Sequence, residues 1–382
     1  MTITNHTYNF NDSHLQSMWQ VGDKLFDNKY LAIQEYINDP KPYHFYCNDL
    51  SWDKWDWSIE PEDSMDVLCT QHALNLRRKY KTLGLGYSGG IDSHTILQIF
   101  LRNNIHLDFI VTWRDEFADL SHPTNFEQKE AVDYLKKIKE KLRNTKVITE
   151  PTNTSFADLT RSNFLGIKDI TELHHENGPP QVGALNHLRN MSSHYYDLIR
   201  SDPSAALIVC SDKPHIIKEK NKWFWQHVDI SSMEVGMPGI EYFYMSNPDP
   251  RIMIKQCHLA ARHIDKHYPL MNDSDHMNYN YNAQRFKEYC FALGRHPTES
   301  EVFYVKNSFL GGEDYDHDCF YKNGGKKHIV RFDLQREHKT KVEGIYNYHM
   351  DMHKKFPVLF NNEGGTHGWL SKKRFISYQK SP

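Results

Sequence analysis

The residues of this sequence that are best suited to chemistry form the segment Ser88–Ser93, which reads SGGIDS. It follows a β-type run, Thr82–Tyr87, and leads into Ser93–Arg102, where apolar residues repeat at helical spacing. Glycines permit a tight turn in which backbone amides approach an anion closely, and the start of a helix presents unpaired N–H groups to that anion. Asp92 would face a phosphate only through a bridging divalent cation. The segment therefore predicts a pyrophosphate site with Mg²⁺.

A second nucleotide-binding pattern overlaps this segment. Gly84, Gly86 and Gly89 match GxGxxG, the dinucleotide fingerprint, in which an acid about 20 residues further on binds the ribose. Asp108 stands near that distance, but it begins its predicted strand instead of ending it. Gly84 and Gly86 also fall inside a predicted strand, and the Walker pattern GxxxxGKS/T is absent. The pyrophosphate interpretation is therefore preferred.

Strand and helix patterns alternate on both sides of the segment. A helix is expected from about Ser64, because acidic residues near its start and Arg77–Lys79 at its end suit the helix dipole. Further helices are expected from Thr124, which forms a capping-box pair with Glu127, and over Ala184–Ile199. The predicted strands are Thr82–Tyr87, Leu107–Trp113, Lys146–Thr149 and Ala205–Cys210. This alternation predicts a parallel sheet that binds ligands at the carboxyl ends of its strands.

SGGIDS resembles the PP-loop of the N-type ATP pyrophosphatases, which include asparagine, NAD, GMP and β-lactam synthetases and tRNA-thiolating enzymes. The resemblance implies an α/β fold with a parallel, five-stranded, Rossmann-like sheet flanked by helices. It also implies ATP and Mg²⁺ as cofactors, and a reaction in which a substrate oxygen is adenylated, pyrophosphate leaves and a nucleophile displaces AMP. By the order of elements it extends over about residues 64–270, although only the loop matches by identity. The nucleotide-binding residues that it implies are Tyr87, Ser88, Gly89, Gly90, Ile91, Asp92, Ser93, Thr112 and Trp113.

A later segment, Ser211–Pro214, is similar in position to an acidic motif of the asparagine-synthetase branch. The similarity implies that Asp212 holds Mg²⁺ together with Asp92, and that Lys213 offsets phosphate charge. The Gly and the Asp-Glu pair of that branch are missing here, and an ordinary strand-end turn explains the same residues. Lys255 is a further candidate for stabilising the transferring phosphoryl group, in a segment that an ordinary helix explains equally well.

The chain divides into three predicted parts: an extension packed on the core (1–63), an ATP-binding domain (64–270), and a mostly helical C-terminal region that is a candidate active-site lid (271–382). Asparagine synthetases carry an N-terminal glutaminase domain, whereas only about 80 residues precede the loop here, which are too few for such a domain and a linker. The expected nucleophile is therefore ammonia or an amine from elsewhere. The expected activity is that of an AMP-forming ligase that adenylates a carboxylate or amide oxygen of a small molecule.

Two other functions remain open. One is a tRNA- or base-thiolating enzyme, or a reductase of activated sulfate, on the same fold; the other is a non-catalytic protein that binds adenine nucleotides. Thiolases usually show a basic surface and paired cysteines, whereas the net charge here is −3 and the six cysteines include no CxxC. This charge gives no sign of a nucleic-acid partner, without excluding one.

The remaining composition is that of a reduced, cytoplasmic protein with no membrane partner. No apolar run approaches the ~20 residues that span a bilayer, and the first ten residues lack the apolar segment of a signal peptide. The pairs His263/His267 and His349/His353 share helical spacing, but they have too few neighbouring ligands to indicate zinc. The basic cluster 372–374 is expected to be solvated.

Overall fold

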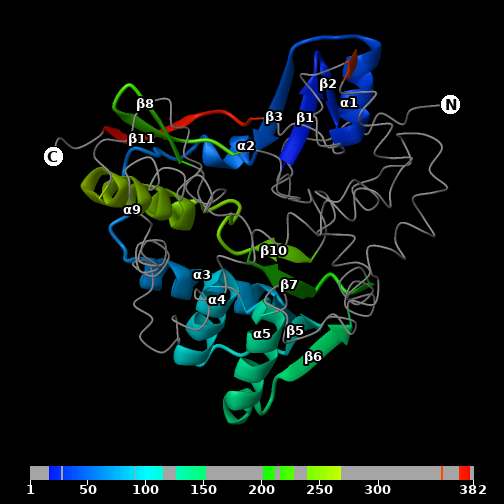
Figure 1. Cartoon of the computed structure of the whole chain (residues 1–382), viewed down its shortest axis with the longest axis vertical. Coiled ribbons are helices and arrows are strands. Elements are labelled where there is room, and N and C mark those ends of the chain that lie inside the picture. Colours follow the sequence, from blue (N-terminus) through cyan, green and yellow to red (C-terminus); the bar gives the residue numbers. More distant parts are fainter. Residues whose placement is uncertain are drawn as a thin grey trace.

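The N-terminal region of the computed structural model forms a small antiparallel sheet, drawn in blue in Figure 1. In this sheet β1 (Ser17–Val21) pairs with both β2 (Lys24–Phe26) and β3 (Tyr43–Cys47). Helices α1 (Lys29–Asn38) and α2 (Asp49–Trp52) follow β2 and β3. The residues that the structure describes are 17–26, 29–89, 91–114, 126–151, 201–210, 216–227, 239–267, 354–355 and 370–378.

The centre of the fold is a five-stranded sheet in which every neighbouring pair of strands is parallel (Figure 1). Its spatial order is β10-β7-β4-β5-β6, and the strands are β4 (Thr82–Gly86), β5 (Phe109–Arg114), β6 (Lys146–Pro151), β7 (Ala205–Val209) and β10 (Ile240–Tyr242). Helix α3 (Met65–Lys79) precedes β4, and α4 (Ile91–Arg102) connects β4 to β5. Helix α5 (Phe126–Lys137) and the 3-10 helix Lys139–Leu142 lead to β6. The predicted Rossmann-like α/β sheet is confirmed.

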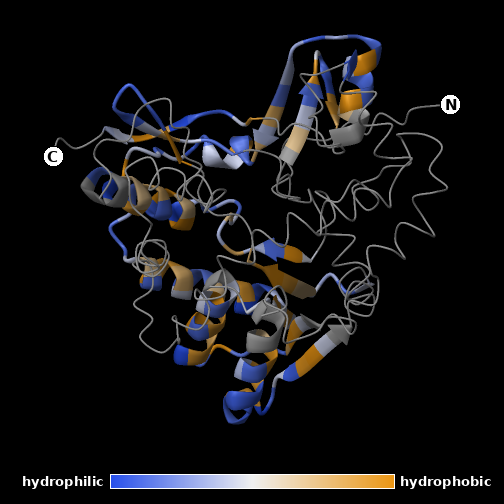
Figure 2. Cartoon of the chain, in the orientation of Figure 1, coloured by the Kyte–Doolittle hydropathy of each residue, from blue (hydrophilic) through white to orange (hydrophobic). Residues whose placement is uncertain are grey.

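Apolar sequence explains why the central strands are buried. Strand β7 reads AALIV, and its first four residues are almost fully buried, as is the β4 segment from Leu83 to Gly86. Continuous apolar runs of this kind are typical of parallel strands covered on both faces. Figure 2 shows β7 in the colour of hydrophobic residues. Leu85 and Ile208 belong to one apolar cluster with residues of α3, α4 and α5, which fixes these helices on one face of the sheet.

Helix α3 begins and ends where its charges predict. Ser64 Oγ accepts a hydrogen bond from Val67 N at 3.3 Å, Asp66 lies in the first turn, and Arg77–Lys79 form the last turn. A side-chain cap of this kind stabilises a helix by about 1 kcal/mol. The predicted helix start at about Ser64 is confirmed.

Strand β5 begins at Phe109, two residues later than predicted, because Asp108 just before it is hydrogen-bonded through its side chain. The Asp108 carboxylate accepts hydrogen bonds from Arg77 Nη1 at 2.6 Å and Leu83 N at 2.7 Å. Asp108 therefore sits at the amino end of the sheet, opposite the end where a ribose would bind. Gly84 lies within β4, where an added Cβ would come within 2.1 Å of the Phe109 ring. Asp108 and Gly84, two of the four residues of the dinucleotide pattern, thus have structural roles.

A second small antiparallel sheet joins two distant parts of the chain. Strands β8 (Ile216–Glu219) and β9 (Lys222–Trp225) form a hairpin between β7 and β10 in sequence, and β11 (Arg374–Tyr378) pairs with β9. Helix α9 (Arg251–His267) packs against both α3 and this sheet (Figure 1). The described part of the C-terminal region thus contributes a strand to a sheet that begins within residues 64–270. The predicted helices of that region otherwise fall outside the described residues.

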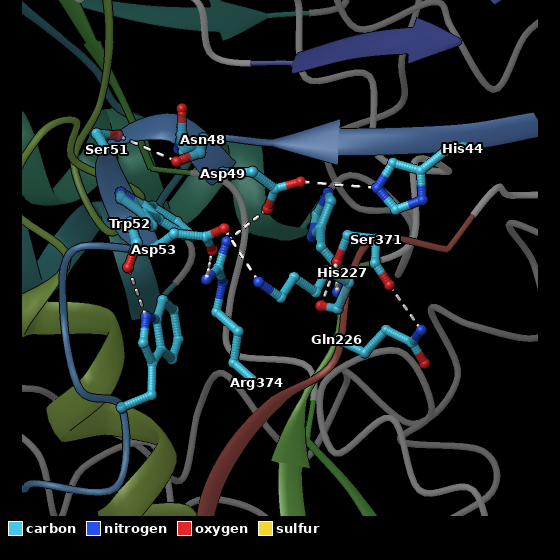
Figure 3. Close-up of polar contacts among 12 residues, drawn as sticks. His44, Asn48, Asp49, Ser51, Trp52, Asp53, Gln226, His227, Ser371 and Arg374 are labelled. Atoms are coloured by element: carbon cyan, nitrogen blue, oxygen red, sulfur yellow. Dashed lines mark hydrogen bonds and ion pairs between the residues drawn. The ribbon is translucent and has the colours of Figure 1, made fainter. Parts of the chain in front are cut away.

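Arg374 corrects the expectation of a solvated basic cluster at residues 372–374. Its side chain is only 5% exposed, and its guanidinium donates to the carboxylates of Asp49, at 2.5 Å, and Asp53 (Figure 3). The guanidinium also lies 5.2 Å from the ring centroid of Trp57 and 5.9 Å from that of Trp225. The expectation was wrong for Arg374 because its partners are 325 and 321 residues away in sequence, where no local pattern reveals them.

Several predicted features lie outside the described residues. They include the helix over Ala184–Ile199, the cap at Thr124 and the pair His349/His353. Among the helices that are described, none combines the length and the apolar character needed to cross a membrane.

Candidate functional site

The direction in which the chain adds strands to the sheet reverses at β4. After β4 the chain adds β5 and then β6 on one side, and it later returns to add β7 and β10 on the other side. Open α/β sheets bind ligands beyond the carboxyl ends of the strands at such a switch point. The residues that follow β4 are Tyr87, Ser88 and Gly89, so the topology places the start of the SGGIDS segment at this position.

The turn after β4 has a backbone that its glycine permits. Gly89 has a φ of 79°, in the left-handed region that residues with a Cβ rarely adopt. Ser88 N donates a hydrogen bond to Ser93 Oγ at 3.2 Å, and the two serine hydroxyls are 3.2 Å apart. Helix α4 begins at Ile91, so these bonds connect Ser93, in the first turn of the helix, to Ser88 at the start of the loop. Ser93 is buried whereas Ser88 is exposed, which leaves the outer side of the turn accessible to a ligand.

A series of hydrogen-bonded polar side chains, buried at Tyr87 and His94 and half-buried at Gln98 and Tyr134, supports the loop from the core side. Tyr87 is fully buried, and its hydroxyl lies 3.0 Å from His94 Nδ1. His94 Nε2 lies 3.2 Å from Gln98 Nε2, which donates to Tyr134 Oη at 2.5 Å. Tyr87 N donates to Val111 O at 2.8 Å, so the ring and the amide of this predicted nucleotide contact are both engaged within the protein. Sequence analysis missed this series of side-chain contacts, although His94 and Gln98 share a helix face at i,i+4 spacing.

Thr112 lies near the carboxyl end of β5, next to Val111, whose carbonyl oxygen accepts the hydrogen bond from Tyr87 N. Its side chain is buried, and its Oγ1 has no hydrogen-bond partner among the described residues. Buried hydroxyl groups are nearly always hydrogen-bonded, so Thr112 Oγ1 is suited to a group outside that set. Trp113 follows in the same strand, and its side chain lies outside the described residues.

The predicted metal and charge residues are only partly described. Ile91 and Asp92 form the first turn of α4, but their side chains lie outside the described set, as do Gly90, Asp212 and Lys213 entirely. Within the described ranges, no group of three or more histidine, cysteine or acidic side chains is arranged to hold a metal ion. The predicted Mg²⁺ ligands Asp92 and Asp212 therefore remain predictions.

Lys255 lies in α9 and is engaged in an ion-pair network. Its Nζ lies 2.8 Å from Glu60 Oε1 and donates to Pro61 O at 2.9 Å, and Arg262 donates to the same glutamate. Partial burial favours the neutral form of Glu60, but the hydrogen bonds and charges of Arg262 and Lys255 outweigh it and lower its pKa to about 2. The structure thus gives Lys255 a clear role in holding α9 to the segment before α3.

Fold and loop together define a parallel α/β protein with a glycine–serine turn at the switch point of its sheet. The sequence matches no family model and no curated protein. Among solved structures, it is similar to an NH3-dependent NAD synthetase from Campylobacter jejuni in complex with the nitrate ion. The two are 12% identical, the match covers 66% of this chain and 98% of that chain, and the TM-score is 0.32. A similarity of this size assigns no function.

Proposed function

We propose that this protein binds ATP with its pyrophosphate moiety in the loop Ser88–Ser93 and is an AMP-forming ligase. The observation that carries the proposal is the strand–SGGIDS–helix unit, with Gly89 in the left-handed region, at the carboxyl end of the strand where the sheet changes direction. A tight glycine turn at a helix start supplies several backbone N–H groups to one anion. The position and the shape of the turn therefore agree with the chemistry predicted from its residues.

In the proposed complex, the amides at the start of α4 and the hydroxyl of Ser88 donate to the β and γ phosphates. Ser93 has a second role, because its Oγ already accepts from Ser88 N and keeps the turn closed. Thr112 Oγ1, buried without a partner in the described part, gains one from the adenosine side of the nucleotide. Donors fixed in place before the reaction stabilise the negative charge that develops as pyrophosphate leaves.

The proposed reaction has two steps. A carboxylate or amide oxygen of a small acceptor attacks the α-phosphorus, the bond to the bridging α–β oxygen breaks, and pyrophosphate leaves with the electron pair. Ammonia or an amine then attacks the activated carbon, and AMP leaves. Mg²⁺, for which Asp92 and Asp212 are the proposed ligands, would neutralise phosphate charge when bound.

The two candidate lysines differ in what supports them. Lys213 follows β7, the strand beside β4, and it remains the proposed charge partner of the phosphates. Lys255 is assigned no catalytic step, because its ammonium group is held by Glu60 and Pro61.

The described cysteines weigh against sulfur transfer as the alternative chemistry. Cys47, Cys69 and Cys257 are buried. Burial raises the pKa of Cys69 to about 12 and that of Cys257 well above its ordinary value, so neither supplies a thiolate at neutral pH. Cys210 is half-buried directly after β7, and its Sγ lies 3.7 Å from Gly86 O, at the end of the strand that precedes the loop. A ligase needs no thiol, so the cysteines in the described part of the chain favour the ligase.

The test is the identity of the nucleotide products. Purified protein is incubated with ATP, Mg²⁺, ammonium and a metabolite extract as the source of acceptor, and the nucleotides are separated by chromatography. The proposal expects AMP and pyrophosphate, with a matched incubation in excess EDTA as the control. ADP and orthophosphate as the main products would contradict it, whereas tight ATP binding without turnover would favour the non-catalytic alternative.

A further inference from the structure

A groove of about 360 Å³ lies beside β10, the edge strand of the parallel sheet. It is separated from the SGGIDS loop by β7, which lies between β10 and β4. One wall is helix α3, and the other is formed by β10 and the segment that leads into α9. A volume of this size is within the range of small-molecule sites. The lining residues are Leu68, Gln71, His72, Asn75, Leu76, Lys79, Glu241, Ser246, Asn247, Pro248, Asp249, Arg251 and Ile252.

The wall from α3 combines an apolar floor with neutral polar groups. Its lining residues recur at spacings of three and four, so they form one stripe along the helix. Leu68 and Leu76 supply apolar surface, while Gln71 and Asn75 supply carboxamides. Neither carboxamide has a hydrogen-bond partner in the part of the chain that the structure describes. Each can both donate and accept.

His72 lies in the same wall with an unsatisfied nitrogen. Its Nε2 is buried and has no hydrogen-bond partner among the described residues, and its ring meets Phe243 edge-on with centroids 4.8 Å apart. Burial outweighs the nearby carboxylates and lowers the pKa of His72 to about 4. The imidazole is therefore neutral at pH 7, with one donor and one acceptor nitrogen. Because Nε2 is shielded from solvent, the ring must turn toward the groove before a molecule bound there can supply the missing partner.

The charged residues that line the groove form two ion pairs. Lys79 Nζ lies 2.7 Å from Glu241 Oε1, and Arg251 Nη2 lies 2.7 Å from Asp249 Oδ2. Asp249 also accepts from Arg251 N, so the start of α9 is already capped. The formal charges of the lining cancel, and a polyphosphate would meet a carboxylate beside either cation. The groove is therefore built for a ligand without net charge.

We propose that this groove is a second binding site, for a neutral planar molecule that carries an N–H donor beside a C=O acceptor. A carboxamide and the lactam edge of a nucleobase both present this pair. Gln71, His72 and Asn75 hydrogen-bond that edge, and the leucines of α3 pack on the flat face. The site is independent of the ATP site proposed above.

The test uses benzamide and uracil as probes, because they carry the same donor–acceptor pair in a carboxamide and in a lactam. Benzoate is the matched control, since it keeps the shape of benzamide but lacks the donor and is charged. In NMR titrations of the full chain, we expect saturable binding of at least one probe, and benzoate binding at least tenfold weaker than benzamide. The tighter of the two probes identifies the amide or the nucleobase class.

Variants locate the site. Gln71→Leu and Asn75→Leu change exposed side chains and should each weaken probe binding at least fivefold, as should His72→Phe. Leu74→Ala, on the same helix but outside the lining, should bind as the wild type does. ATP titrated into each variant should retain its wild-type affinity, which separates failure of this site from failure of the ATP proposal. Absence of binding by both probes, or wild-type affinity in both Gln71→Leu and Asn75→Leu, would overturn the inference even if His72→Phe does not fold.

Discussion

The loop after β4 and the cluster around Arg374 both gather polar groups, but they use them differently. In the cluster, the charges of Arg374, Asp49 and Asp53 are paired with one another, and the side chains of Arg374 and Asp49 are buried (Figure 3). The loop instead offers Gly89, with its left-handed backbone, the start of helix α4 and the exposed residue Ser88. Charges satisfied inside the protein hold segments together, whereas exposed donors on a braced turn are suited to a ligand. Four predictions test this distinction.

The largest effect is expected from Gly89→Val. A valine at a φ of 79° is strained, by about 1–3 kcal/mol, and relieving the strain displaces the turn and several amides at once. We expect the affinity for ATP, measured by calorimetric titration, to fall more than tenfold.

Gly22→Val is the matched control for this change. Gly22 also has a positive φ, of 59°, and an added Cβ would lie 2.6 Å from Lys41 Cδ, but it belongs to the turn between β1 and β2. The control should lose stability and keep its ATP affinity. Equal ATP affinity in Gly89→Val and the wild type would place the phosphate site elsewhere.

Arg374→Met tests the other side of the comparison. The substitution leaves the Asp49 carboxylate buried beside Asp53 without its cation, and breaking a buried pair costs about 3–5 kcal/mol. We expect a large drop in the urea midpoint of unfolding, with ATP affinity unchanged in the fraction that stays folded. Lys373→Met, which removes an exposed pair with Glu219, should cost less than about 1 kcal/mol. A folded Arg374→Met protein that no longer binds ATP would break the distinction.

The Glu60 network predicts an acid-sensitive part of the stability. The pKa of Glu60 falls from 4.5 to about 2 on folding, so the unfolded state binds the proton first as the pH drops. The stabilisation is fully present above pH 4.5 and is lost between 4.5 and about 2. Glu60→Gln should therefore be less stable than the wild type at pH 7, and the gap in unfolding free energy should close toward pH 2. A gap that is constant over this range would refute the assignment.

Tyr134→Phe should have the smallest effect. It removes the hydroxyl that accepts from Gln98, behind the loop, and one hydrogen bond contributes about 1 kcal/mol net. We expect a modest loss of stability and a change in ATP affinity of less than about fivefold. Tyr46→Phe, which removes a tyrosine–glutamine bond of the same length in the N-terminal sheet, should leave ATP affinity unchanged. A larger loss of ATP affinity in Tyr134→Phe than in Gly89→Val would mean that the hydrogen bonds behind the loop, and not the turn itself, determine binding.

The parts of the fold that follow from local pattern were predictable from the sequence. The start of α3 follows from Ser64 and the charge order, and β7 follows from an unbroken apolar run. The turn at Gly89 follows because a strand and a helix meet within a few residues. In each case the physical cause lies within one element or one turn.

The parts that depend on distant partners were not predictable. Strand β11 pairs with β9 about 150 residues earlier in the chain, and Arg374 meets Asp49 across 325 residues. The ion pair of Lys255 with Glu60 was not predictable either, because Glu60 lies far upstream in the sequence. The His94–Gln98–Tyr134 chain was missed because its third member comes from another helix.

Hydrogen exchange with and without ATP tests the central claim most directly, because it reports where the nucleotide binds without needing the acceptor. Amide exchange is followed by mass spectrometry in wild-type protein with ATP and Mg²⁺. We predict slower exchange in peptides that cover residues 87–95, and unchanged exchange in peptides of β1–β3 and of the β8–β9 hairpin. Protection confined to other segments, with the peptides over residues 87–95 unchanged, would contradict the account.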